Sequence, residues 1–196
     1  MPPVLETLRA VDPTFREIPL QADGRFTTQF SSRSGYRVEF LTPNTGLDDY
    51  GGRPAPMPAL GGAAAQPLRF LDFLIHPPFR AVLLHGAGVP VNVPSPDKFA
   101  IHKLIVATRR RTDNDGTAKS RKDRLQAVTI MQVLIEQRQT EDLADASMGA
   151  CGRGTAWKEA IRKSMDQIED DIHGRIKSAL ADGIRKLERD PAEFNL

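Results

Sequence analysis

The chain has 196 residues, of which 40% are hydrophobic and 27% charged, and its formal net charge at pH 7 is +2. These values are typical of a soluble globular protein with one ordinary core, and they give no global electrostatic case for nucleic-acid binding. The single cysteine, Cys151, excludes an internal disulfide and a cysteine-rich zinc site. The sequence shows neither a signal peptide nor an apolar run of roughly 18 residues, so we expect a cytoplasmic protein with no membrane partner.

The first part of the chain predicts strands. Residues 4–10 fit the end of a helix, whereas residues 25–31 and 36–41 alternate apolar and polar side chains, as half-buried strands do. The turn Ser32–Gly35 between them predicts a β-hairpin. Glu39 lies on the strand face that is turned away from the aromatic residues of its strand.

The next part is less regular. Residues 43–67 are rich in glycine, proline and alanine and have no periodicity, which predicts a loop. Residues 68–75 form an apolar segment whose length does not decide between helix and strand. Residues 80–85 and 89–93 predict a second hairpin, turned at Gly86–Gly88. That Gly-x-Gly lacks the third glycine and the following helix of a dinucleotide-binding site.

A helix is predicted over residues 96–110. Ser95 is suited to the N-cap and Pro96 to the first helical position. The helix is apolar nearly all round, and such a helix is usually buried. Lys103 lies within this apolar surface, so it needs an anionic partner or a path to solvent for its ammonium group.

The next predicted helix, residues 117–138, offers that partner. Helical spacing places Asp123 on one stripe with Ala127 and Leu134, where an apolar side chain is expected. Lys119 lies one turn earlier on the same stripe. A carboxylate in this position is either part of a structural ion pair or a functional group, and the pattern alone does not distinguish the two.

The C-terminal part predicts further helices. Residues 141–148 fit a short helix, and Thr155 fits the cap of the next one. From Trp157 onward, apolar residues recur every three or four positions, which predicts a long amphipathic helix interrupted at Gly174 or Gly183. Its apolar stripe fits an intramolecular core or the seam of a homodimer.

Strands followed by helices predict an α+β fold. We expect a small mixed or antiparallel sheet in residues 1–94 and a helical part in residues 95–196. Few residues stand out chemically. The four histidines lack the spacing of metal ligands, and His102 fits a surface or hydrogen-bonding histidine better than a catalytic base. Glu39, in the middle of a strand, fits a metal ligand or an ordinary solvated face shared with Arg37.

Four segments are informative when they are taken together. They are residues 8–15, 35–43, 93–104 and 119–127, and they include Pro-x-x-Phe-Ala-x-His-Lys-Leu and a Lys-Asp pair. In these segments the chain resembles a bacterial family with the nucleotidyltransferase fold. That family is distantly similar to polymerase-beta-like transferases and to the nucleotidyltransferase toxins of toxin–antitoxin systems. The resemblance covers about residues 5–136.

The resemblance implies the transfer of a nucleoside monophosphate from a nucleoside triphosphate to an unknown acceptor, with Mg²⁺ as the cofactor. In such chemistry two metal ions, held by three carboxylates, clamp the attacking and leaving oxygens. The roles that the resemblance assigns are metal binding and catalysis for Glu39, catalysis for Asp123, and nucleotide binding for Lys103, His102, Lys119 and Lys122.

The chain also departs from the family pattern. The Gly-Ser turn and the Asp-x-Asp strand that supply the triphosphate loop and the first two carboxylates are not found before Glu39. We therefore expect an N-terminally truncated or degenerate member that does not catalyse. An incomplete sheet would leave an exposed edge that invites a partner. The alternative is a non-catalytic nucleotide-binding or protein-interaction module, whose basic cluster at Arg109–Arg124 meets phosphate or an acidic partner.

Overall fold

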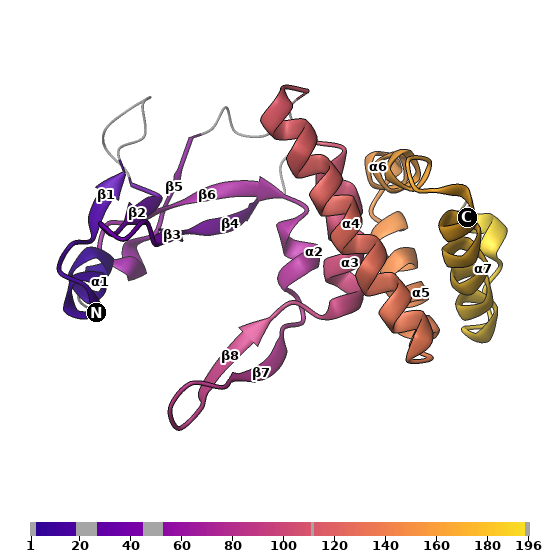
Figure 1. The fold of residues 1–196 in the computed structure, drawn as a ribbon, viewed down its shortest axis with the longest axis horizontal. Helices are drawn as coiled ribbons and strands as arrows, with labels where there is room; N and C mark the ends of the chain where they lie inside the picture. The colour runs from indigo at the N-terminus through magenta and orange to yellow at the C-terminus, as the bar shows by residue number, and fades with distance from the viewer. Residues whose placement is uncertain (1–2, 19–26, 45–52, 111, 195–196) are drawn as a thin grey trace. The chain divides into compact units, whose positions relative to one another are not determined.

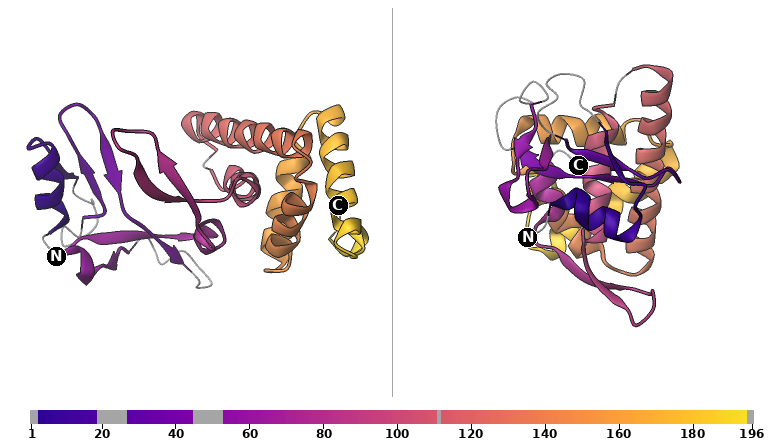
Figure 2. Two further views of the ribbon diagram at one scale, coloured as in Figure 1. Left: turned by 90° about the horizontal axis from the view of Figure 1, so that it is seen from below. Right: turned by 90° about the vertical axis from the view of Figure 1, so that its left-hand side faces the viewer.

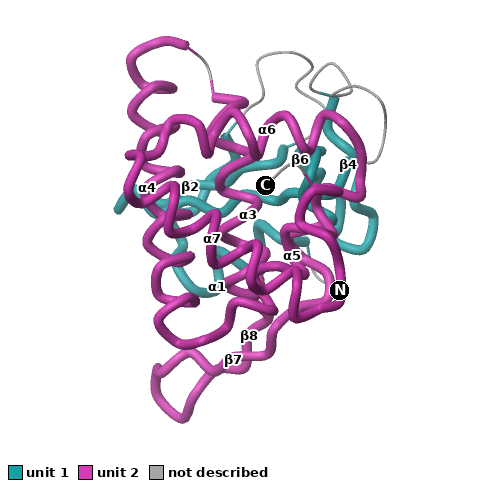
Figure 3. The backbone as a smooth tube through the Cα atoms, turned by 90° about the vertical axis from the view of Figure 1, so that its right-hand side faces the viewer, with its two compact units in different colours: residues 1–72 teal, residues 73–196 magenta. Residues whose placement is uncertain are grey.

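The computed structural model describes residues 3–18, 27–44, 53–110 and 112–194 (Figure 1). The backbone falls into two units, residues 1–72 and residues 73–196, which are coloured separately in Figure 3 and are described here one by one. The boundary expected from the sequence, at residue 94, marks the change from strands to helices, whereas the boundary at residue 72 separates two compact units. The mixed α+β class expected from the sequence is confirmed.

The first unit begins with a helix and a small antiparallel sheet of three strands in the order β1-β2-β3. Their bounds are α1 Val4–Val11, β1 Arg16–Ile18, β2 Gln29–Ser31 and β3 Arg37–Glu39. The hairpin predicted between β2 and β3 is confirmed, with Phe30 opposite Val38. Gly35 in its turn has a φ of 86°, a left-handed conformation that favours glycine. The predicted strand residues 25 and 26 lie outside the described part of the chain.

The prediction that residues 43–67 form a loop is wrong for the part that the structure describes. It contains the end of β4 (Leu41–Asn44), β5 (Ala55–Pro56), the short 3₁₀ helix η1 (Pro58–Leu60) and most of β6 (Ala64–Arg69). Strand β6 pairs in parallel with β4 and antiparallel with β5. Adjacent residues of β6, Ala64 and Ala65, are both buried. A strand covered on both faces has no alternating pattern, and small residues are a weak strand signal.

The ambiguous segment at residues 68–75 contains both structures. It comprises the end of β6 and the short helix α2, Leu71–Ile75, which spans the boundary between the two units. Phe70, between them, has a φ of 69°. The core of the first unit gathers around Phe15 and Phe30.

The described residues of the second unit form a β-hairpin and five longer helices. Their bounds are β7 Phe79–Leu83, β8 Val89–Val93, α3 Pro96–Ala107, α4 Asn114–Glu136, α5 Thr140–Cys151, α6 Thr155–Met165 and α7 Asp170–Lys186, with the 3₁₀ helix η2 Pro191–Phe194 after them. The predicted hairpin at Gly86–Gly88 is confirmed, and it extends away from the helices (Figure 1).

Helix α3 lies at the centre of the helical bundle, as its apolar character predicts. It packs against α4, α5 and α6. Ile101, Leu104 and Ile105 are completely buried. The helix ends at Ala107 rather than at residue 110, and Ser95 occupies the N-cap position although its side chain makes no capping hydrogen bond.

The amphipathic helical stretch predicted from Trp157 is present and is interrupted, but the predicted place of the interruption is wrong. The chain breaks between α6 and α7, at residues 166–169, whereas Gly174 and Gly183 both lie inside α7. Helix α7 lies beside α5 in both Figure 1 and Figure 2. Gly183 lets the two backbones approach, so this glycine serves packing rather than an interruption. Thr155 is the first residue of α6, and Gly154 takes the cap position.

Candidate functional site

A buried carboxylate joins α3 and α4. Lys103 of α3 donates a hydrogen bond from Nζ to Oδ1 of Asp123 on α4, over 2.7 Å. Arg110, in the turn after α3, donates from Nε to the other oxygen, Oδ2, over 2.8 Å. The side chain of Asp123 is 1% exposed, whereas Lys103 is 19% and Arg110 37% exposed. We call these three residues the Asp123 cluster.

The sequence explains why the three residues meet. Arg110 lies three residues after the end of α3, in the segment that leads to α4, and from there its guanidinium reaches Asp123. The apolar neighbours of Asp123 on α4 pack that face against α3. The Ser120 hydroxyl donates to the carbonyl of Ala107 over 2.6 Å, which fixes the end of α3 against α4. The ion pair predicted between the lysine and the aspartate is therefore confirmed.

The charge of Asp123 is stabilised despite its burial. Burial raises the pKa of Asp123, but hydrogen bonds and charge interactions with Lys103 and Arg110 outweigh this effect and hold the pKa below its ordinary value. The carboxylate thus stays ionised at neutral pH and orients both cations.

Both cations are partly exposed and have more N–H donors than their bonds to Asp123 require. Lys103 has three N–H donors and Arg110 has five, and their hydrogen bonds to Asp123 use only some of them. The Lys103 ammonium also lies 5.2 Å from the centre of the Phe99 ring. Two cations against one carboxylate leave a net charge of +1. Cations oriented in this way are suited to contact phosphate oxygens.

The other residues expected to bind nucleotide are arranged differently. Lys119 pairs with Asp115, one turn earlier on α4, and does not contact Asp123. Lys122 is exposed, and His102 is half-buried on α3 beside Lys103 in sequence. Arg110 belongs to a basic run noted in the sequence, but no signal in the sequence marks it individually as a partner of Asp123.

Glu39, the predicted metal ligand, lies at the end of β3 in the first unit. Its side chain is exposed and accepts a hydrogen bond from the Gln29 side chain on β2 over 2.8 Å. Within the described ranges, no group of three or more His, Cys, Asp or Glu residues is placed to hold a metal ion. The described residues therefore do not fit a site for two metal ions.

The sequence does contain one Asp-x-Asp, at Asp113 and Asp115, after Glu39 rather than before it. It forms the start of α4. Asp113 is the N-cap and accepts a hydrogen bond from the backbone N–H of Gly116 over 2.7 Å. These carboxylates therefore have the role of a helix cap and an exposed ion pair.

A family model described as "Nucleotidyltransferase" matches residues 1–152. The chain belongs to this nucleotidyltransferase family. The match extends through α3 and α4 and so includes the Asp123 cluster and all residues that the resemblance assigned to the site. Comparison with curated proteins and comparison with solved structures give no match.

The family match ends at the C-terminus of α5, so α6 and α7 lie beyond it. Among the helices of the described residues, none is long and apolar enough to cross a membrane.

Proposed function

We propose that this nucleotidyltransferase-family protein binds the phosphates of a nucleoside triphosphate through Lys103 and Arg110, which Asp123 holds in place. The observation that carries the proposal is the buried carboxylate that orients two partly exposed cations. The family reaction that this site would serve is the transfer of a nucleoside monophosphate to an acceptor.

The charge balance favours this role over a purely structural one. A single lysine is enough to neutralise a buried aspartate, and a second cation leaves an excess positive charge that faces solvent. Phosphate oxygens are well matched to such a pair, because guanidinium and ammonium groups form charge-assisted hydrogen bonds with them. Lys119, Lys122 and His102 lie on the same two helices and would add further contacts.

The metal part of the proposal rests on the resemblance. The resemblance alone assigns Mg²⁺ to Glu39, which lies in the first unit, and the described residues do not fit a site for two metal ions. The residues before Glu39 contain neither Gly-Ser nor Asp-x-Asp. We therefore propose that these 196 residues by themselves bind nucleotide without transferring it.

Calorimetric titration of ATP and GTP, with Mg²⁺ or Mn²⁺, tests the proposal. We expect Lys103→Ala to weaken binding at least tenfold, because it removes a phosphate contact. Lys163→Ala, an exposed lysine on α6, is the matched control and should leave the affinity unchanged. A folded wild-type chain that binds neither nucleotide, or equal affinity in the two variants, would contradict the proposal.

A second candidate function is a non-catalytic protein-interaction module. The observation that favours it is the β7–β8 hairpin, whose apolar side chains are exposed, Leu84 by 94% and Val82 by 61%. Exposed apolar surface of this kind is typical of contact sites. Two results together would favour this function over the first. The chain associates with itself or with a partner, and the double variant Val82→Ser/Leu84→Ser abolishes that association. The wild-type chain binds no nucleotide.

A further inference from the structure

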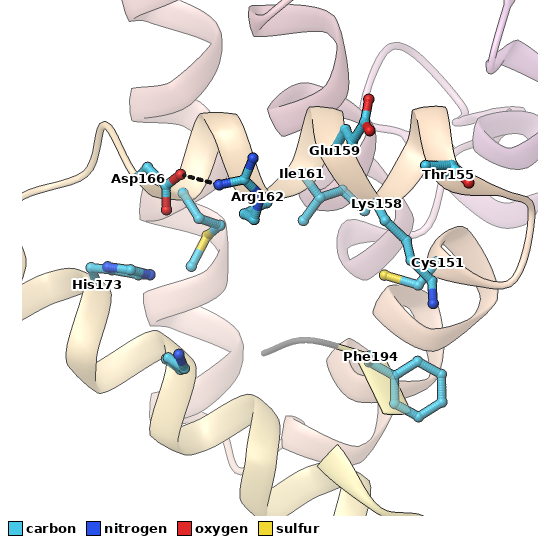
Figure 4. Close-up of a pocket in the computed structure, with 11 residues that line it drawn as sticks. Cys151, Thr155, Lys158, Glu159, Ile161, Arg162, Asp166, His173 and Phe194 are labelled. Atoms are coloured by element: carbon cyan, nitrogen blue, oxygen red, sulfur yellow. Dashed lines mark hydrogen bonds and ion pairs between the residues drawn. The ribbon is translucent and has the colours of Figure 1, made fainter. Parts of the chain in front are cut away.

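The helices beyond the family match enclose a cavity of about 400 Å³. It is lined by the end of α5, one side of α6, the first half of α7 and Phe194 of η2 (Figure 4). Its volume is in the range of small-molecule sites, roughly 300–1,000 Å³. None of the residues given a role in nucleotide binding lines it.

The inner wall of the cavity is apolar. Ile161 and Met165 of α6 and Cys151 of α5 line it, and each of these residues is at least 95% buried. An apolar body that enters this space would remove both its own surface and that of the wall from water, which is favourable.

The charged side chains that line the cavity carry more positive than negative charge. Arg162 is neutralised by Asp166 at 3.2 Å, so this pair contributes no net charge. Lys158 of α6 and Lys177 of α7 both line the cavity, and neither forms an ion pair within the described part of the chain. The one carboxylate left in the lining, Glu159, is directed away from the middle of the cavity (Figure 4).

Lys158 lines the cavity with a half-buried side chain. Its ammonium donates a long hydrogen bond of 3.4 Å to the backbone carbonyl of Glu193. Burial raises the pKa of the Cys151 thiol, and the positive charge of Lys158 acts in the opposite direction. The His173 imidazole points into the cavity from α7 (Figure 4).

We propose that this cavity binds a small amphipathic organic anion, with its apolar body against Ile161 and Met165 and its anionic head between Lys158 and Lys177. An anionic group in that position would be attracted by the charges of both lysines. The chemistry selects for a carboxylate, sulfonate or phosphate monoester that carries an aromatic or short aliphatic group. This cavity shares no residue with the proposed nucleotide site.

The test uses two fluorescent probes with the same aromatic body on the full chain. 8-Anilinonaphthalene-1-sulfonate carries the anionic group, and N-phenyl-1-naphthylamine is its uncharged counterpart. We expect one sulfonate probe to bind per folded chain. The double variant Lys158→Gln/Lys177→Gln should weaken its binding at least tenfold, while the uncharged probe should change by less than twofold.

The control is Lys163→Gln/Arg175→Gln, which removes the same charge from exposed positions on α6 and α7 that do not line the cavity. It should bind both probes as the wild type does. Met165→Trp, which fills the cavity, should reduce the binding of both. Cooperative urea unfolding verifies that each variant is folded. Equal losses of sulfonate binding in the two double variants, or no binding to the folded wild type, would overturn the proposal.

Discussion

Asp123 is an ionised carboxylate within the packed interface of α3 and α4, and two cations make that position tolerable. A buried charge without partners costs several kcal/mol, so its partners and its burial must be considered together. Lys103 and Arg110 each bond to a different oxygen of the carboxylate. The same contacts that stabilise the helix pair therefore orient the cations that we propose to bind phosphate.

Asp123→Asn should lower the free energy of unfolding by about 3 kcal/mol at pH 7, because two cations then face a neutral amide. The folded pKa of Asp123 lies below its unfolded value. The stabilisation is therefore complete above about pH 4 to 5 and is lost as pH falls through the folded pKa. Urea unfolding of both proteins from pH 7 to pH 3 measures the difference, which should shrink at low pH.

The control is Asp115→Asn on the same helix, where the carboxylate is 77% exposed and pairs with Lys119. Such exposed pairs contribute roughly 0–1 kcal/mol, so this variant should unfold almost as the wild type does. A cost for Asp123→Asn no larger than that for Asp115→Asn would mean that the buried cluster does not stabilise the interface.

At the scale of the elements, the approach of α5 and α7 depends on one glycine. A Cβ atom added at Gly183 would contact the backbone carbonyl of Thr140 and lie 2.9 Å from the Cβ of Ala144. Both groups belong to α5, and neither is the end of a flexible side chain, so the helices would have to separate. Gly174, nine residues earlier on α7, has open space at the same position.

We expect Gly183→Ala to destabilise the protein by about 1–3 kcal/mol through overpacking. Gly174→Ala is the matched control and should stabilise by up to about 1 kcal/mol, because alanine is the better helix former. Thermal and urea unfolding measure the change in stability of each variant, and the two changes should have opposite signs. A Gly183→Ala variant as stable as Gly174→Ala would show that α5 and α7 are not in such close contact.

At the scale of the whole molecule, the chain consists of two units, and the second contains its own buried core. Side chains from α3, α4, α5 and α7 contribute completely buried residues to it. The Asp123 cluster and the cavity at α6 both lie within this unit. A unit with a core of its own is expected to fold independently of the rest of the chain.

A fragment of residues 71–196, which begins with α2, should therefore keep a helical circular-dichroism spectrum and unfold cooperatively in urea. The position of its transition should respond to Asp123→Asn as that of the full chain does, because Lys103, Arg110 and Asp123 are all retained. A fragment without a cooperative transition would mean that the second unit requires the first unit in order to fold.

The sequence predicted both hairpins and the buried character of α3, because alternation and an all-round apolar helix are local patterns. It also predicted the partnership of Lys103 with Asp123, since a charge on each of two apolar stripes requires compensation. The strands within residues 53–69 were missed because alanine and proline give little strand signal. The break between α6 and α7 was placed at glycines, although no glycine lies between the two helices.

The sequence by itself determined the fold class, the family resemblance and the pairing of a buried lysine with an aspartate, because these depend on patterns that are local along the chain. Only the tertiary structure decided that Arg110 completes the cluster, that Lys119 turns to Asp115 instead, and that α5, α6 and α7 enclose a cavity. Each of these depends on distances between segments that are separate in the chain, and those distances arise when apolar faces pack together.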